Sequence, residues 1–213
     1  IASFELVDLL LIEAVAATGK PIILSTGMAS EDEISSAVDA CGGAGVTILK
    51  CVSSYPANAS DYNLMTLEDM MRNYDCEVGL SDHTRTPTAA VVSAVLGAQM
   101  IERHITLTAG GLDDLFASTP REFSHMVESV REALESLGTV RYGSTPSEAP
   151  SVALRRSLWA KKPIREGELL TPDNIMTARP ADGAACSMLP VLLGKRSTID
   201  YRAGDPIQAL QFR

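Results

Sequence analysis

The sequence lacks the features of a membrane protein, of a disulfide-rich domain and of a nucleic-acid-binding protein. No apolar run approaches the roughly 20 residues that a membrane-spanning helix needs. With 18 Lys and Arg against 27 Asp and Glu, the chain has a net charge of −9 and offers no basic face for phosphate contacts. Its 4 cysteines are scattered and form no CxxC pair. We therefore expect neither a zinc knuckle nor a disulfide framework, but reduced thiols in the cytoplasm.

The apolar content is sufficient to bury a core. Hydrophobic residues make up 46% of the 213 residues, which excludes disorder and supports one medium domain, or one domain with a small companion. The chain begins at Ile1, without Met or a signal-peptide pattern. Residues 1–3 have the pattern of a strand end, and we expect the chain to be a fragment whose upstream part is missing.

Short apolar segments alternate with helical segments over the first two thirds of the chain. The segments predicted as strands are residues 21–24, 46–52, 78–80 and 100–107. A strand thus starts every roughly 25–30 residues, which is typical of parallel α/β folds. The strands are apolar throughout rather than alternating, as expected for a sheet that helices cover.

Helix starts are marked by capping residues. Ser30 with Glu33, and Thr119 with Glu122, have the spacing of capping boxes, so each pair predicts a helix start. A further helix is predicted over residues 62–72.

The composition changes after residue 142. Residues 143–151 are rich in Gly, Ser, Thr and Pro and are interpreted as a linker. Short β-like segments and turns follow. We therefore predict a first domain over residues 1–142 and a small β-rich domain over residues 152–213.

Polar side chains stand at the end of each predicted strand, two residues apart. Side chains at i and i+2 share a face of a strand, and the ends of parallel strands gather in one site. Gly27 and Gly79 indicate either close backbone approach or plain turns. We predict a convergent site from four pairs: Ser3 with Glu5, Ser53 with Tyr55, Ser81 with His83, and Glu102 with His104.

His83 and His104 lie one βα unit apart, which predicts that they share a divalent metal. Two protein nitrogens suit a loosely held Mn²⁺ or Mg²⁺ better than structural zinc, which prefers four protein ligands. The alternative is a buried neutral imidazole bonded to a carbonyl. Glu102 either orients a ligand or acts in acid–base chemistry, or it pairs with Arg103 or a Lys. Asp113 lies in a Gly-rich loop that is otherwise only a turn.

Five short motifs stand in order along the chain: residues 1–5 (IASFE), 20–28 (KPIILSTGM), 51–56 (CVSSYP), 79–84 (GLSDHT) and 101–107 (IERHITL). Together they resemble the sialic acid synthase family. Residues 155–195 resemble that family's C-terminal antifreeze-like β-clip domain. Each motif alone is short, but five in order followed by this tail are specific.

The resemblance implies an α/β fold: a partial TIM (β/α)8 barrel, strands 4 to 8, followed by a small antifreeze-like (SAF, β-clip) domain. In the family this domain is usually exchanged across a homodimer. Strands 1 to 3, with basic residues that hold phosphoenolpyruvate, are then absent, and we expect this chain alone to be inactive.

The implied reaction joins phosphoenolpyruvate to an N-acetylated aldose, N-acetylmannosamine or a 2,4-diacetamido-trideoxyhexose. It gives a nine-carbon 2-keto acid and phosphate for bacterial surface carbohydrate. Carried over by motif, the implied roles are metal ligation by His83 and His104; catalysis by Glu5; phosphoenolpyruvate binding by Ser3 and Ser81; sugar or metal-bound water contacts from Tyr55, Glu102 and Asp113; and contact with the neighbouring subunit's sugar by Arg179.

Two departures from the family pattern leave the sugar open. Ser53, counted here as substrate-binding, stands where many synthases for the common sialic acid have Asn, and residues 111–114 lack a usual Pro and His. Both features resemble synthases for pseudaminic or legionaminic acid, or spore-coat polysaccharide relatives. The alternatives are another metal-dependent aldolase, or an inactive fragment whose residues 152–213 serve binding or dimerisation. We expect no nucleic-acid or membrane partner.

Overall fold

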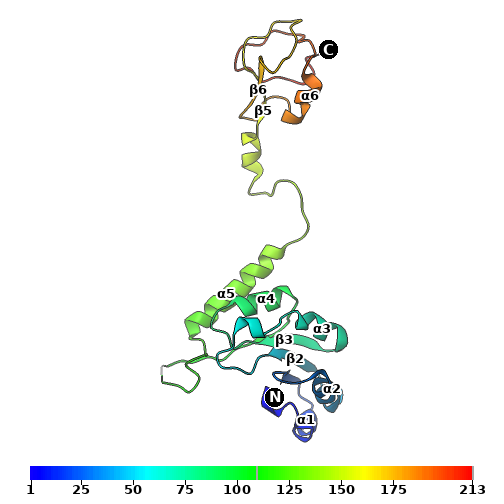
Figure 1. The fold of residues 1–213 in the computed structure, drawn as a ribbon, viewed down its shortest axis with the longest axis vertical. Helices are drawn as coiled ribbons and strands as arrows, with labels where there is room; N and C mark the ends of the chain where they lie inside the picture. Colours follow the sequence, from blue (N-terminus) through cyan, green and yellow to red (C-terminus); the bar gives the residue numbers. More distant parts are fainter. Residues whose placement is uncertain (109, 213) are drawn as a thin grey trace. The chain divides into compact units, whose positions relative to one another are not determined.

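The computed structural model describes residues 1–108 and 110–212, which form two compact units (Figure 1). The first unit spans Ile1–Thr139 and the second spans Val140–Arg213. Each unit is described by itself. The domain boundaries predicted from composition stay a prediction.

The first unit is built on a parallel sheet with the order β1-β2-β3-β4. The strands are β1 (Ile22–Ser25), β2 (Val46–Cys51), β3 (Glu77–Ser81) and β4 (Ile101–Glu102). Neighbouring strands are consecutive in the chain and are joined by helices, so the predicted α/β class is confirmed. The register pairs Ser81 at the end of β3 with Glu102 at the end of β4.

Helices connect the strands and follow the last one (Figure 1). They are η1 (Ser3–Glu5), α1 (Leu9–Ala16), α2 (Glu31–Ala40), η2 (Ala59–Asp61), α3 (Thr66–Asn73), α4 (Thr88–Val95) and α5 (Pro120–Leu137). Both predicted capping boxes are confirmed: Ser30 starts α2 with Glu33, and Thr119 starts α5 with Glu122. Their side chains satisfy backbone N–H groups that the first helical turn leaves unpaired.

Two of the predicted elements are shorter in the structure than the sequence indicates. The helix predicted over residues 62–72 begins only at Thr66, because Asn63 takes a positive φ of 45° and ends the preceding turn. The strand predicted over residues 100–107 is two residues long, and beyond it only Ile105 forms an isolated bridge, to Ser118.

The strand end predicted at residues 1–3 is only partly present. Ile1 donates to the carbonyl of Ile23 at 2.7 Å and accepts from the amide of Ser25 at 3.0 Å, as a neighbouring parallel strand would. Ser3–Glu5 then turns into a 3-10 helix. The expectation that Ser3 and Glu5 share one strand face is therefore wrong, since a 3-10 helix places successive side chains about a third of a turn apart.

The core of the first unit lies between one face of the sheet and the helices. Leu24, Ile48 and Val78 point to this face and are at most 3% exposed. They pack against α1, α2 and α3 in one cluster that includes Ile12 and Leu67. Burying each such side chain contributes roughly 1.5–3 kcal/mol. Because strand side chains alternate, the polar ends of the same strands face the other side.

The second unit is small and has little regular structure. It contains η3 (Ala149–Leu154), β5 (Ser157–Ala160), β6 (Ile175–Ala178), η4 (Cys186–Met188) and α6 (Leu189–Leu192). Strands β5 and β6 pair antiparallel, and several isolated bridges extend this sheet. Its own core includes Leu158, Ile164 and Ile207, each at most 1% exposed. Residues 152–213 thus contain a small antiparallel sheet, and the rest of the described part of this segment is isolated bridges, turns and short helices.

Within the described residues, no helix is long and apolar enough to cross a membrane. All four cysteines are free thiols.

Candidate active site

The predicted polar residues gather at the carboxyl ends of β2, β3 and β4. Ser81 and Glu102 are paired in register, and His83 and His104 each follow two residues later. Equal offsets from paired residues on parallel strands place both imidazoles at the same height. Their ring centroids are 5.3 Å apart and the ring planes meet at 64°.

Each imidazole is held through its Nδ1 atom. Nδ1 of His83 lies 2.8 Å from the carbonyl oxygen of Val52, and Nδ1 of His104 lies 2.9 Å from Oδ2 of Asp113. Both partners accept, so each Nδ1 carries a proton, and in a neutral imidazole with this tautomer Nε2 presents a lone pair. This is the arrangement of metal-binding histidines, whose second nitrogen is fixed by a carbonyl or carboxylate.

The environment keeps His83 neutral. Its side chain is buried, and burial lowers the pKa of the imidazole below its usual value. Neighbouring His104 lowers this pKa further, while the bond to Val52 and the charges of Glu102 and Asp82 partly oppose the shift. A neutral imidazole is the form that ligates a metal.

Aromatic rings surround the two imidazoles. Tyr55 lies 4.4 Å from His83 and 5.8 Å from His104, measured between ring centroids. Phe116 lies 4.8 Å from Tyr55 and 5.0 Å from His104. Burial raises the pKa of the Tyr55 hydroxyl. The sequence interpretation missed Phe116, although it comes only three residues after Asp113.

A second group of polar atoms lies where β1 and β2 end. The amide of Gly27 donates to Oγ of Ser3 at 3.0 Å. Oγ of Ser53 is buried without a hydrogen-bond partner among the described residues. A β-carbon on Gly27 would collide with Ser53 and lie 2.9 Å from Oγ of Ser3. The interpretation of Gly27 as a point of close backbone approach is therefore confirmed.

The same interpretation is confirmed for Gly79. A β-carbon there would strike the backbone of Met100 and the side chain of Leu49. Close packing of β3 against its two neighbouring strands thus requires glycine at this position.

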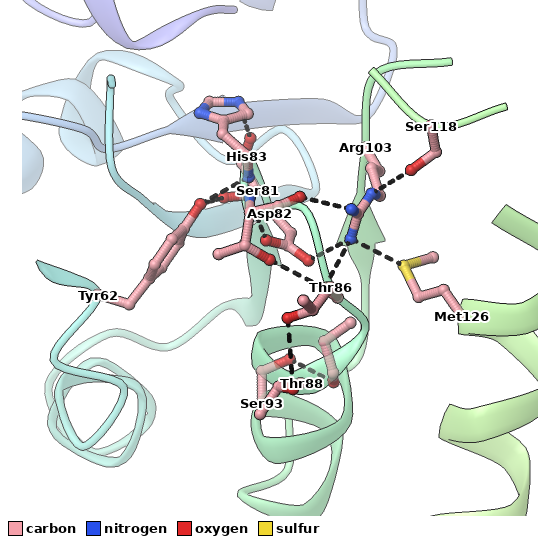
Figure 2. Close-up of polar contacts among 12 residues, drawn as sticks. Tyr62, Ser81, Asp82, His83, Thr86, Thr88, Ser93, Arg103, Ser118 and Met126 are labelled. Carbon is pink, nitrogen blue, oxygen red and sulfur yellow. Dashed lines mark hydrogen bonds and ion pairs between the residues drawn. The ribbon is translucent and has the colours of Figure 1, made fainter. Parts of the chain in front are cut away.

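Asp82, the residue before His83, forms a buried ion pair with Arg103 (Figure 2). Oδ2 of Asp82 lies 2.8 Å from Nη1 of Arg103, and their side chains are 0% and 4% exposed. The alternative in which Glu102 pairs with Arg103 is therefore wrong. Glu102 instead accepts a long hydrogen bond of 3.4 Å from Oγ of Ser81, which also lies 3.3 Å from Nε2 of His83.

Tyr62, at the end of η2, ties that segment to the end of β3. Its hydroxyl accepts from the His83 amide at 2.7 Å and donates to the Ser81 carbonyl at 3.1 Å. The side chain is fully buried, and burial raises the pKa of the hydroxyl. Sequence reasoning assigned this residue only to a helix.

The side chains of two predicted residues are exposed. Glu5 is exposed in η1, and Arg179 is exposed after β6 in the second unit. The predicted roles of Glu5 and Arg179 stay predictions.

The donor set fits a weakly held divalent cation. Two imidazole nitrogens are available, and carboxylates of Glu102 and Asp113 lie nearby. Across residues 1–108 and 110–212, no three His, Cys, Asp or Glu side chains surround one point. Such a site leaves coordination positions open for water or substrate oxygens, unlike a structural zinc site.

Comparison with known proteins decides the family. Residues 1–142 match the family model described as NeuB family, and residues 155–213 match the SAF domain. The chain belongs to the NeuB family. The resemblance to sialic acid synthases seen in the five motifs is thereby confirmed, and so is the antifreeze-like tail.

Relatives of this NeuB-family chain include synthases. It is 39% identical to an uncharacterized protein of Methanocaldococcus jannaschii and 36% identical to the pseudaminic acid synthase of Helicobacter pylori, over 97% and 98% of its length. The chain spans 63% of each of these relatives. A crystal structure of the spore coat polysaccharide biosynthesis protein spsE of Bacillus subtilis superimposes with a TM-score of 0.61 at 27% identity, covering all of this chain and 66% of that one. The partial barrel is therefore confirmed.

Proposed function

We propose that this chain forms part of a transferase that condenses phosphoenolpyruvate with an N-acetylated aldose. The products are a nine-carbon 2-keto acid of the sialic acid type and phosphate, for bacterial surface carbohydrate. The observation that supports this proposal most directly is the pair of neighbouring imidazoles of His83 and His104, each held at Nδ1 so that Nε2 is left for a ligand. The likeness to the pseudaminic acid synthase of Helicobacter pylori supports the reaction class.

Nε2 of His83 and Nε2 of His104 would hold Mn²⁺ or Mg²⁺. The neutral state of His83, favoured by its burial, suits ligation. When bound, such a cation polarises an aldehyde oxygen and makes its carbon a better electrophile. Asp113 would keep the His104 ring oriented, as its carboxylate accepts from Nδ1.

The hydroxyls of Ser3, Ser53 and Ser81 would bind phosphoenolpyruvate. Ser53 supports this assignment best, because a buried hydroxyl without a partner costs free energy that a ligand can recover. Gly27 has no side chain and therefore lets the hydroxyls of Ser3 and Ser53 approach its backbone closely, which brings the two hydroxyls together.

The remaining roles concern the sugar. Tyr55, Glu102 and Asp113 would contact its hydroxyls, and Glu5 would act as the catalytic carboxylate near the reacting carbons. Arg179 would reach the sugar's N-acyl group in the neighbouring subunit of a homodimer with exchanged SAF domains. We further propose a cytoplasmic location, in keeping with the free thiols.

For the sugar we favour a 2,4-diacetamido-trideoxyhexose over N-acetylmannosamine. The pseudaminic acid synthase of Helicobacter pylori and the Ser at position 53 support this choice. A role in spore-coat polysaccharide synthesis is the second candidate, supported by the likeness to the Bacillus subtilis protein.

The test is release of inorganic phosphate from phosphoenolpyruvate in the presence of Mn²⁺. Each sugar is offered to this chain alone and to a chimera carrying the part of the Helicobacter pylori synthase that has no counterpart here. We expect release by the chimera with the diacetamido sugar, loss of release in His83→Ala, and no release by the chain alone. A folded chimera inactive with every sugar contradicts the proposal.

A further inference from the structure

We propose that the buried ion pair between Asp82 and Arg103 is the positioning element that sets the spacing of His83 and His104. The inference rests on the proposed function in one respect only, namely that this spacing serves to hold a metal ion. Both pair residues act through their neighbours, because neither faces the site.

Strand alternation places the pair directly behind the imidazoles. Asp82 lies between Ser81 and His83, and Arg103 lies between Glu102 and His104. Side chains that alternate along two strands in register put the imidazoles on one face and the ion pair on the other. The amide of Asp82 also donates to the carbonyl of Glu102 at 2.9 Å, so backbone and side chains lock the same two strand ends.

The carboxylate of Asp82 holds the loop that follows His83. Its Oδ1 accepts from the amide of Thr84 at 2.9 Å while Oδ2 binds Arg103. His83 is thereby fixed between two anchored residues. Figure 2 shows the carboxylate between the loop and the guanidinium.

The guanidinium of Arg103 holds the strand that carries His104. Nε donates to Oγ of Ser118 at 2.6 Å, and the amide of Ser118 donates to the carbonyl of His104 at 2.8 Å. Nη1 donates to the carbonyl of Thr86 at 3.2 Å, and Nη2 donates to the carbonyl of Thr84. One planar fork thus joins β4, the loop after β3 and the segment before α5 (Figure 2).

Stability alone does not require this pair. Replacing both partners of a buried ion pair with well-packed hydrophobic residues of similar volume is often neutral for stability, whereas removing one partner is costly. What the ion pair adds is a fixed geometry. A double variant without either charge therefore separates positioning from folding.

The decisive variant is Asp82→Asn with Arg103→Met in the full 213-residue chain. The first substitution keeps a side-chain acceptor for the amide of Thr84, and the second fills the vacated volume with an apolar side chain. Met70→Ala is the matched control. Met70 lies in α3 and is 3% exposed in the core, so truncating its side chain weakens folding away from the two imidazoles. Three quantities are measured: the urea midpoint, Mn²⁺ affinity from the electron paramagnetic resonance signal of free Mn²⁺, and proton NOEs between the two imidazoles without metal.

We expect the double variant to keep a urea midpoint at or above that of Met70→Ala but to bind Mn²⁺ about 10- to 100-fold more weakly than wild type, as for losses behind a metal ligand. Its NOEs between the imidazoles should weaken or vanish. Met70→Ala should show the reverse: a lower midpoint with both site readouts kept. Arg103→Lys, which keeps the charge without the fork, should lie between wild type and the double variant.

Unchanged NOEs and Mn²⁺ affinity in the double variant overturn the inference, as does an equal loss of both readouts in Met70→Ala. A wild-type chain that binds no Mn²⁺ contradicts the proposed metal site instead. In that case the NOE comparison alone decides the positioning role.

Discussion

Ser53 Oγ lies so close to Gly27 that no side chain fits between them. Ser3 also lies close to Gly27, and its Oγ accepts the amide proton of Gly27 at 3.0 Å. The backbone of Gly27 is therefore one wall of the group of hydroxyls proposed to bind phosphoenolpyruvate.

Replacing Gly27 with Ala should displace Ser53 and Ser3. We expect a cost of about 1–3 kcal/mol in the free energy of unfolding, as for overpacking in a core, and loss of phosphoenolpyruvate binding. Gly45→Ala is the control, because a β-carbon there meets nothing within 4 Å; it should stay within about 0.5 kcal/mol of wild type. Urea denaturation and ligand titration measure the two effects, and equal stabilities for both variants would contradict the prediction.

Ser53→Ala should separate binding from folding. Removing a buried hydroxyl without a partner should leave the free energy of unfolding unchanged or raise it by about 1–2 kcal/mol. Loss of one hydrogen bond to phosphoenolpyruvate should weaken its binding about tenfold. Ser54→Ala, which removes an exposed hydroxyl that donates to Pro56, should leave that affinity unchanged. Calorimetric titration of the chimera with phosphoenolpyruvate measures the affinity. A clear loss of stability in Ser53→Ala would contradict the prediction that this hydroxyl serves binding rather than folding.

Asp113→Ala tests the orientation of His104. The carboxylate is 53% exposed, so its removal should change the free energy of unfolding by at most about 0.5 kcal/mol. Mn²⁺ affinity should nevertheless fall about tenfold, because Nδ1 of His104 loses its acceptor. Asp75→Ala removes the same charge just before β3, at the opposite end of that strand, and should bind Mn²⁺ as wild type does. Equal affinities of the two variants would argue against an orienting role.

The start of α5 should make stability depend on pH. Bonds from the backbone and hydroxyl of Thr119 lower the pKa of Glu122. With a folded pKa below the unfolded value of about 4.3, Glu122 stabilises the fold above that value and loses this effect as the pH falls through the folded pKa. In urea unfolding between neutral pH and roughly pH 3, Glu122→Gln and Thr119→Ala should flatten the dependence. Thr119→Ser, which keeps the hydroxyl, should retain the wild-type slope.

Local signals were the most reliable guide to the fold. The capping boxes at Ser30 and Thr119 depend only on residues within one turn, and both are confirmed. The early end of β4 and the turn at Ser3 depend on contacts with distant segments, which periodicity in one sequence does not reveal.

The part of the site that depends on the register of β3 and β4 could be predicted from the sequence. The ion pair on the opposite face of these strands was not predicted. Equal spacing from the strand ends brought His83 and His104 together as expected. Asp82 and Arg103 stand one residue before each imidazole, and the sequence analysis did not predict their ion pair. Applying strand alternation to both residues would have placed them on the buried side.

The pairing of Ser81 with Glu102 has a consequence for how such proteins diversify. His83 and His104 each lie two residues after a member of this pair. The segment between the two strands can therefore lengthen or shorten without altering the distance between the imidazoles. A slip of one residue between β3 and β4 would instead turn one ring into the protein interior. The outer helices can therefore change in length while the side chains at the strand ends keep their arrangement.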